Sequence, residues 1–271
     1  MILKKKNVNL YYEVIDLTAP WVEDPETIVF CHGVAINCEI WAGWLPVLTP
    51  HFRIVRFDTR GFGRSHTQGQ THEWSMDLLA DDIVDVAKAS NTAQFHLVGE
   101  SMGGTACLQL ACRSEVLLQS LSCVSTSHKG GLIQRVGGWR EEVARVGMAG
   151  WSETMMERRF YPAALSEAQR RWFSNVQQQT SANSLLDAAD LLIHTDLTDD
   201  LARIKVPTLL MAPDASPFVP IEIPAEIHNS IPYSELAVFP KTRHGLPFSS
   251  AETCAKTLIS FLDRNFPVSV Y

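Results

Sequence analysis

One hexapeptide, Gly99-Glu100-Ser101-Met102-Gly103-Gly104, constrains the fold of this 271-residue chain more than any other segment. It is a G-x-S-x-G motif between residues 94–98, which have the aromatic and β-branched content of a short strand, and residues 105–112, which continue as a helix. Where a strand turns sharply into a helix, the flanking residues must be small because the two segments approach closely. The motif therefore predicts a strained turn that exposes the Ser101 hydroxyl.

The helix predicted after Ser101 also determines the electrostatics at this serine. Its first backbone N–H groups have no partners within the helix, and the helix dipole adds positive charge at the same end. Both effects stabilise a negative charge that develops on a nearby oxygen, so the Met102 N–H is predicted to be an oxyanion donor. A simple glycine-rich turn is the alternative for a bare motif, and the strand and helix on its two sides argue against it.

Strand-like and helix-like segments alternate along the chain, which predicts a mostly parallel sheet with helices on both faces. The pattern favours strands at 8–15, 27–31, 52–57, 117–125, 208–212 and 236–239, and helices at 75–89 and 251–264. Ser249 and Glu252 have the spacing of a capping box at the start of the last helix. In the helix at 75–89, the acidic residues, Asp82 among them, are predicted to face solvent.

Residues 128–199 interrupt this alternation, because the segment favours helices, has no convincing strand and concentrates aromatic residues. We expect an inserted helical cap over 128–199, between core segments 1–127 and 200–271. The aromatic residues favour a hydrophobic or aromatic-derived substrate. The residues predicted to line the substrate pocket are Trp139, Phe160 and Leu246.

Composition narrows the possible partners. The net charge of −7 and the pI near 5.7 argue against nucleic acid and anionic membranes, which require a basic surface. There is no apparent signal peptide and no apolar run of about 18 residues, so a cytoplasmic protein is expected. The six cysteines are scattered without a C-x-x-C pair, and no motif suggests a metal or a cofactor. We expect a monomer or homodimer that acts on a small molecule.

A serine nucleophile needs a base, and His244 is the best candidate among the histidines. It lies between the last predicted strand and the last helix, on the loop side of the sheet where Ser101 emerges; the alternative is a half-exposed surface histidine. A second oxyanion donor is expected after an early strand, where Gly33 lets the backbone turn and presents the Val34 N–H. His32 is expected to pack beneath the site as a structural residue.

Five motifs in this order resemble the α/β-hydrolase superfamily over nearly the whole chain. They are His32-Gly33, Asp58-x-Arg60-Gly61-x-Gly63-x-Ser65, Gly99-Glu100-Ser101-Met102-Gly103-Gly104, Val206-Pro207-Thr208-Leu209-Leu210 and His244-Gly245. The resemblance implies an α/β-hydrolase fold with a mostly parallel eight-stranded sheet, Ser101 as nucleophile, His244 as base, and Val34 and Met102 as oxyanion donors. Within the superfamily, residues 57–65, 137–140 and 200–207 are similar to the branch of 3-oxoadipate enol-lactonase and related carboxylesterases. That similarity implies hydrolysis of an ester or enol-lactone through an acyl-enzyme.

The acid of the implied triad departs from the family pattern. The family usually places it directly before a proline after the seventh strand, and here Ser216 precedes Pro217. Asp214 lies two residues earlier, and because side chains alternate along an extended segment it is predicted to reach His244. Three alternatives remain: a Ser–His pair without an acid, a carboxylate recruited from Glu100, or Ser216 beside the histidine with Asp214 as a turn residue.

Other functions are compatible with the same motifs. Amide hydrolysis and hydrolytic C–C cleavage share an oxyanion intermediate with ester hydrolysis, and a ligand-binding protein without activity is the non-enzymatic alternative. A substrate carboxylate could be held by an arginine of the insertion, although solvated arginines are the simpler interpretation. The candidate arginines are Arg135, Arg140, Arg158 and Arg159.

Overall fold

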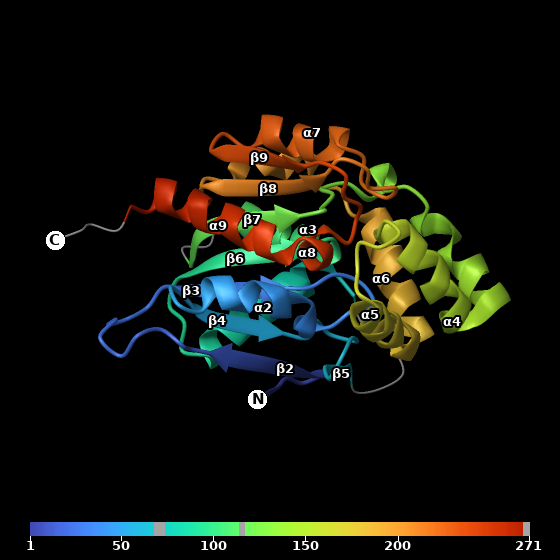
Figure 1. Ribbon diagram of the computed structural model, residues 1–271, viewed down its shortest axis with the longest axis horizontal. Coiled ribbons are helices and arrows are strands. Elements are labelled where there is room, and N and C mark those ends of the chain that lie inside the picture. The colour runs from blue at the N-terminus through green and yellow to red at the C-terminus, as the bar shows by residue number, and fades with distance from the viewer. Residues whose placement is uncertain (68–73, 114–116, 268–271) are drawn as a thin grey trace.

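The computed structural model describes residues 1–67, 74–113 and 117–267, and its central feature is one twisted sheet (Figure 1). The strands are β1 (Ile2–Lys4), β2 (Val8–Ile15), β3 (Thr27–Cys31), β4 (Arg53–Phe57), β5 (His66–Thr67), β6 (Phe95–Glu100), β7 (Leu118–Val124), β8 (Thr208–Pro213) and β9 (Ser234–Phe239). Eight of them follow the order β1-β2-β4-β3-β6-β7-β8-β9, and the short β5 pairs with β2.

The neighbours in the series β4-β3-β6-β7-β8-β9 all pair in parallel, whereas β2 pairs antiparallel with β1, β4 and β5. The predicted fold class, a mostly parallel eight-stranded sheet flanked by helices, is therefore confirmed, with β5 as a two-residue addition. In the register, Gly99 of β6 lies beside Cys31 of β3 and Cys123 of β7. Because parallel strands end at the same edge of a sheet, the segments after β3, β6 and β9 come together there.

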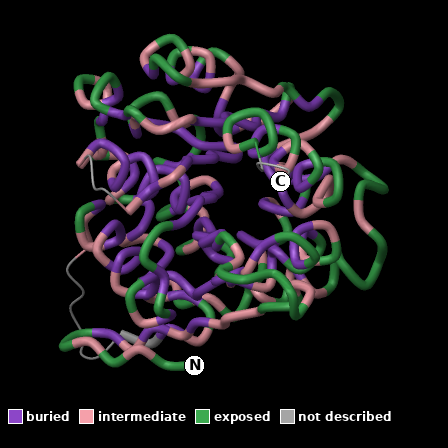
Figure 2. Tube along the Cα trace, turned by 90° about the vertical axis from the view of Figure 1, so that its left-hand side faces the viewer, coloured by how far each residue is buried: buried purple, intermediate pink, exposed green. Residues whose placement is uncertain are grey.

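Helices cover both faces of the sheet. They are η1 (Cys38–Trp44), α1 (Leu45–Leu48), α2 (Met76–Ala89), α3 (Met102–Cys112), η2 (Gly130–Leu132), η3 (Val136–Gly138), α4 (Trp139–Arg159), α5 (Glu167–Gln179), α6 (Ala182–His194), η4 (Thr198–Arg203), α7 (Glu222–Ser230), α8 (Leu246–Ser249) and α9 (Ala251–Asn265). Alternation along β3 defines two cores: Val29 packs in the one that contains α2, α3 and α7, and Phe30 in the one that contains η1 and α9. Figure 2 shows the buried segments gathered in the interior.

Helices α4, α5 and α6 form what we call the helical insertion, between β7 and β8. Figure 1 shows them together at one end of the sheet. The base of the insertion is closed where Lys129 and Asp196 form a β-bridge and a 2.8 Å ion pair, and where the Leu197 N–H donates to the His128 carbonyl at 3.0 Å. Its interpretation as a cap with bounds 128–199 stays a prediction.

Two local predictions are wrong. Ser249 does not cap the last helix: it ends α8, its hydroxyl donates to the Gly245 carbonyl at 3.2 Å, and Ser250 precedes α9 without a side-chain cap. Asp82 does not face solvent, because it is fully buried and accepts two hydrogen bonds from the Arg60 guanidinium at 2.7 and 2.8 Å. Separately, no helix within the described ranges is long and apolar enough to cross a membrane.

Candidate active site

Ser101 lies at a strained turn between β6 and α3, as the motif predicts. Its backbone has φ 53° and ψ −120°, a conformation that costs energy for a residue with a Cβ. The Ser101 N–H donates to the Val124 carbonyl at 3.0 Å, and its own carbonyl accepts the Thr105 N–H at 3.0 Å, so β7 and α3 hold the turn. A Cβ on Gly103 would lie 2.5 Å from the Cys31 carbonyl oxygen, which explains the glycine there.

His244 contacts the nucleophile candidate directly. Its Nε2 lies 3.1 Å from the Ser101 Oγ, and its side chain is 4 % exposed. The loop between β9 and α8 that carries His244 is fixed by the helical insertion, since the Gly245 N–H donates to the Arg159 carbonyl at 2.9 Å. The structure thus brings together two residues that are 143 positions apart in the chain.

The acid position differs from the prediction. The Asp214 carboxylate is exposed and accepts the backbone N–H groups of Lys241 at 2.8 Å and Thr242 at 3.1 Å, so it stabilises the turn after β9. The atom beside His244 Nδ1 is the Ser216 Oγ, at 3.2 Å. The expectation that Asp214 orients His244 is corrected accordingly, and the arrangement found is the alternative in which Ser216 takes the family's acid position.

Hydrogen bonding at Ser216 determines how the imidazole is protonated. The Ser216 Oγ accepts from the N–H groups of Phe218 at 3.3 Å and Val219 at 3.0 Å, which occupies its lone pairs. Its remaining hydrogen is therefore assigned to His244 Nδ1, and the neutral ring then carries its proton on Nε2, facing Ser101. Burial, and to a smaller extent the Arg159 cation, lowers the pKa of His244 to about 3, so the ring is neutral near pH 7.

The predicted oxyanion donors, Val34 and Met102, line the same cavity as Ser101 and His244. The two peptide groups on either side of Gly33, the second of which carries the Val34 N–H, are each held by a side chain. The Gly33 N–H donates to Glu100 Oε2 at 2.8 Å, and His32 Nδ1 lies 2.7 Å from the Gly33 carbonyl oxygen.

The orientation of His32 follows from its other ring nitrogen. Nε2 accepts the Thr59 N–H at 2.9 Å, so Nδ1 carries the hydrogen that is donated to the Gly33 carbonyl. Burial lowers the pKa of His32 and keeps this ring neutral. Because a carbonyl that accepts a hydrogen bond polarises its peptide, His32 strengthens the Val34 N–H as a donor. His32 is thus a positioning residue beneath the site.

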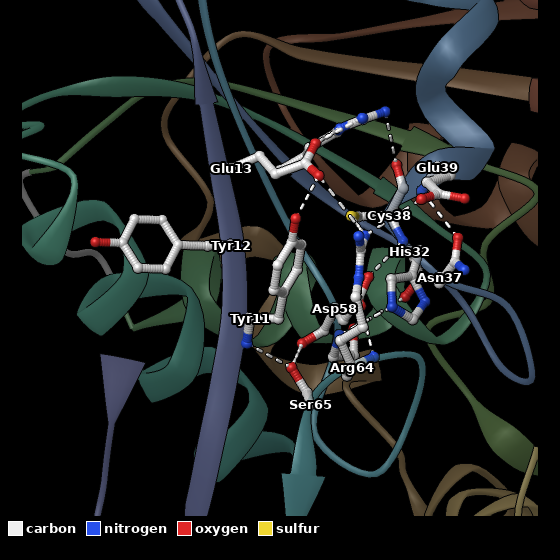
Figure 3. Close-up of polar contacts among 12 residues, drawn as sticks. Tyr11, Tyr12, Glu13, His32, Asn37, Cys38, Glu39, Asp58, Arg64 and Ser65 are labelled. Carbon is white, nitrogen blue, oxygen red and sulfur yellow. Dashed lines mark hydrogen bonds and ion pairs between the residues drawn. The ribbon is translucent and has the colours of Figure 1, made fainter. Parts of the chain in front are cut away.

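A polar network around Asp58 supports this loop from below (Figure 3). Asp58 accepts the backbone N–H groups of Cys38 at 2.8 Å and Arg64 at 2.7 Å, which ties the segment after β3 to the segment after β4. The Arg64 guanidinium lies 3.6 Å from the centre of the Tyr11 ring. The Asp-x-Arg-Gly motif therefore has a structural function in this chain.

A small cavity opens at the Ser101 hydroxyl. Part of its wall comes from the helical insertion, and that part is mainly apolar. In the wall, Trp139, Arg159 and Leu192 belong to the helical insertion, Ile133 and Val136 to the segment that leads into it from β7, and Phe218 and Val219 to the segment after β8. Of the three predicted pocket residues, Trp139 lines this cavity.

Phe160 and Leu246 belong to the packed core beneath the cavity and are not in its described lining. The Phe160 ring lies 5.0 Å from the Phe173 ring and covers Gly245, where a Cβ would come within 2.1 Å of it. Leu246 is fully buried with α9 in the core of that face. These two predictions are corrected, because aromatic content alone does not distinguish a cap core from a pocket wall.

The four candidate arginines differ in how far they are buried and in whether they line the cavity. Arg159 is 3 % exposed and lines the cavity, whereas Arg135 and Arg140 are exposed and Arg158 faces Glu142 at 3.5 Å. In the sequence, nothing distinguished Arg159 from the other three arginines. Among the described residues, no cluster of three or more His, Cys, Asp or Glu side chains could hold a metal ion.

A serine on a strand-to-helix turn, a histidine after the last strand and a helical insertion over the carboxyl ends of parallel strands define the class of α/β hydrolases. The model of the alpha/beta hydrolase fold matches residues 26–251, and the chain belongs to this family.

Relatives extend over nearly the whole chain. The AB hydrolase superfamily protein YisY of Bacillus subtilis is 25% identical and covers 96% of this chain and 97% of its own length. The 3-oxoadipate enol-lactonase 1 of Acinetobacter baylyi is 26% identical over 73% of this chain and 74% of its own. A thermophilic esterase from Thermogutta terrifontis has the same fold, with a TM-score of 0.84, 22% identity and coverage of 98% and 99%. Family and relatives support a hydrolytic enzyme.

Proposed function

We propose that the chain hydrolyses a small carboxylic ester or lactone, with Ser101 as nucleophile and His244 as base. The observation that carries this proposal is the 3.1 Å contact between Ser101 Oγ and His244 Nε2 inside a small cavity. Ser101 Oγ attacks the carbonyl carbon while its proton passes to Nε2, and the N–H groups of Val34 and Met102 stabilise the oxyanion. Collapse releases the alcohol, which takes the proton from His244, and water then hydrolyses the acyl-enzyme by the same steps.

The base step requires an unprotonated Nε2. With Ser216 donating to Nδ1, the ring must first change to the tautomer that carries its proton on Nδ1. The Ser216 Oγ can accept from Nδ1 only after it gives up one of its two backbone partners, of which the Phe218 N–H at 3.3 Å is the more distant. No carboxylate touches Nδ1 among the described contacts to stabilise the imidazolium, so we expect a slower reaction than a complete triad gives.

The cavity wall supports a hydrophobic or aromatic-derived substrate, since Trp139, Val136 and Phe218 surround the serine. The name of one relative, 3-oxoadipate enol-lactonase, agrees with the hydrolysis of an ester or lactone. Amide hydrolysis and C–C cleavage use the same nucleophile and are alternatives that a substrate panel separates. We further propose that the protein acts in the cytoplasm as a monomer or homodimer.

Labelling with a fluorophosphonate tests the proposal. We expect one adduct per chain, mapped to Ser101, and a loss of activity of about 10² to 10⁴ in Ser101→Ala, which is less than a complete triad would lose because no acid contributes to the wild-type rate. Ser125→Ala is the matched control, because the Ser125 hydroxyl lines the same cavity and makes no hydrogen bond in the described structure. Labelling of another residue, or none in a folded protein, would contradict the proposal.

A ligand-binding protein without turnover is the second candidate function. The specific observation in its favour is the Ser216 hydroxyl at the place of an acid beside His244. That function predicts labelling of Ser101 by the activated probe but no multiple turnover on any ester, lactone, amide or ring-cleavage dienoate.

A further inference from the structure

We propose that the Arg159 guanidinium is an anion subsite in the active-site cavity and binds a carboxylate that the substrate carries besides its reacting carbonyl group. This inference rests on the proposed function and defines its substrate class as small esters or lactones with one free carboxylate. Arg159 is the last residue of α4, is 3 % exposed, and lines the cavity together with Ser101 and His244.

The hydrogen bonding of Arg159 is incomplete. A guanidinium has five N–H donors, and the Nε of Arg159 is buried without a partner. The Arg159 Nη2 donates to the Val34 carbonyl oxygen at 3.3 Å, which is long for a hydrogen bond. Arg60, the comparable buried arginine, instead makes two hydrogen bonds to the Asp82 carboxylate at 2.7 and 2.8 Å.

A buried charge without a hydrogen-bonded counter-ion is costly, so the unpaired donors call for an anion. The titratable groups that interact with Arg159 are Glu100 and His244. Glu100 Oε2 already accepts the Gly33 N–H, and burial raises the pKa of Glu100 to about 7, which makes it a weak counter-ion. His244 is neutral and cannot supply negative charge.

The backbone places the guanidinium next to the reacting groups. The Arg159 carbonyl accepts the N–H of Gly245, the residue after the base, at 2.9 Å. Its Nη2 contacts Val34, whose N–H is the proposed oxyanion donor. A carboxylate on Arg159 therefore lies close to the carbonyl that Ser101 attacks, since both residues line one cavity, and this closeness restricts the acid to a short chain or a single ring. The apolar wall contacts the carbon atoms between the two groups.

Two esters of equal size test this subsite. Monomethyl succinate carries a carboxylate where methyl 4-methylpentanoate carries an isopropyl group of the same shape. We expect the wild-type protein to prefer monomethyl succinate in kcat/KM by about 10- to 100-fold, the range of a charge-assisted hydrogen bond. Arg159→Met should abolish this preference, mainly by raising KM for the anionic ester, and Arg159→Lys should retain part of it.

Arg158→Met is the matched control, since Arg158 is adjacent in sequence but faces Glu142 outside the cavity. It should leave the preference unchanged. Equal kcat/KM for the two esters in the wild type, or equal losses on both esters in a folded Arg159→Met protein, would overturn the inference.

Binding separates this inference from the proposed function. If no ester is hydrolysed, calorimetry with monomethyl succinate still measures the subsite, because the wild type should bind it at least about 10-fold more tightly than Arg159→Met does. Equal binding by both proteins contradicts the anion subsite, whereas tight binding without turnover contradicts only the hydrolase. Thermal unfolding of each variant identifies a loss that comes from misfolding.

Discussion

At the scale of single residues, the protonation of His244 depends on its neighbour Ser216. The Ser216 oxygen accepts two backbone N–H groups and so has only its hydrogen to offer the imidazole Nδ1. A carboxylate at this position would instead accept the Nδ1 hydrogen and leave Nε2 free to take the Ser101 proton. One side chain therefore determines which tautomer faces the nucleophile.

Ser216→Asp should for this reason raise kcat by about 10² to 10⁴, since loss of a triad carboxylate typically costs about 10⁴ through the wrong tautomer. The measurement is kcat on an activated ester, with fluorophosphonate labelling rates as a second readout. Asp214→Asn is the control: Asp214 accepts only backbone N–H groups of the turn, so this variant should keep its rate and unfold at a slightly lower Tm. A large loss of kcat in folded Asp214→Asn, or no gain in folded Ser216→Asp, would contradict this account.

At the scale of elements, sequence patterns located the long strands and helices well. The predicted 8–15 and 27–31 coincide with β2 and β3, and α2 begins one residue after Ser75, whose hydroxyl accepts the Leu78 N–H at 3.1 Å. The short elements, such as β5 with two residues, have too few positions for a period to be visible. Ser249 illustrates a different limit. The sequence pattern of a capping box is present, but Ser249 is the last residue of α8 and so cannot cap α9.

The helical insertion and the sheet contribute different parts of the site. The nucleophile and base come from segments after β6 and β9, whereas Trp139 and Arg159 come from the two ends of α4. Contacts between α4 and the His244 loop, such as the hydrogen bond from the Arg243 guanidinium to the Glu157 carbonyl at 2.5 Å, connect the two parts. Substrate contacts and bond breaking are therefore expected to respond separately to mutation.

Trp139→Ala should change substrate preference more than reactivity. The Trp139 ring lines the cavity, so its removal should raise KM for esters of aromatic acids while kcat for a small acetate ester changes little. Phe160→Ala should behave differently: this ring packs on Phe173 and Gly245, so we expect a loss of stability of about 3–5 kcal/mol. Steady-state kinetics on both esters and urea unfolding measure the two effects. An equal fall of kcat on all substrates in stably folded Trp139→Ala would argue against this division.

At the scale of the whole molecule, the chain order of motifs predicted more of the site than local patterns did. Ser101 and His244 could be paired in advance because parallel strands end at one edge of the sheet. The sequence left the choice between Asp214 and Ser216 open, and it did not indicate the contacts of Arg159, since both depend on how loops and α4 lie against the sheet. Burial of Arg159 is a property of the assembled fold, and no periodicity in residues 139–159 indicates it.

The same burial predicts how activity and stability of the whole protein respond to pH. A general base must be deprotonated, and burial together with the Arg159 cation lowers the pKa of His244 to about 3. We therefore expect kcat/KM to stay nearly constant from about pH 8 to about pH 5, whereas an ordinary histidine of pKa about 6.5 would lose activity in that range. Ser216→Asp should raise this pKa and shift the acid limb to higher pH.

The free energy of unfolding should also depend on pH, because the pKa of His244 is lower in the folded protein than in the unfolded chain. Between about pH 6.5 and pH 3, His244 is protonated in the unfolded chain but neutral in the folded protein. The free energy of unfolding therefore decreases as the pH is lowered through this range, and His244 does not affect it above about pH 6.5. Urea unfolding at several pH values, compared with His244→Gln, isolates this contribution because glutamine does not titrate. A wild-type activity profile with its midpoint near 6.5, or identical pH dependence of unfolding in the two proteins, would show that His244 is solvated and would remove the basis for a buried catalytic pair.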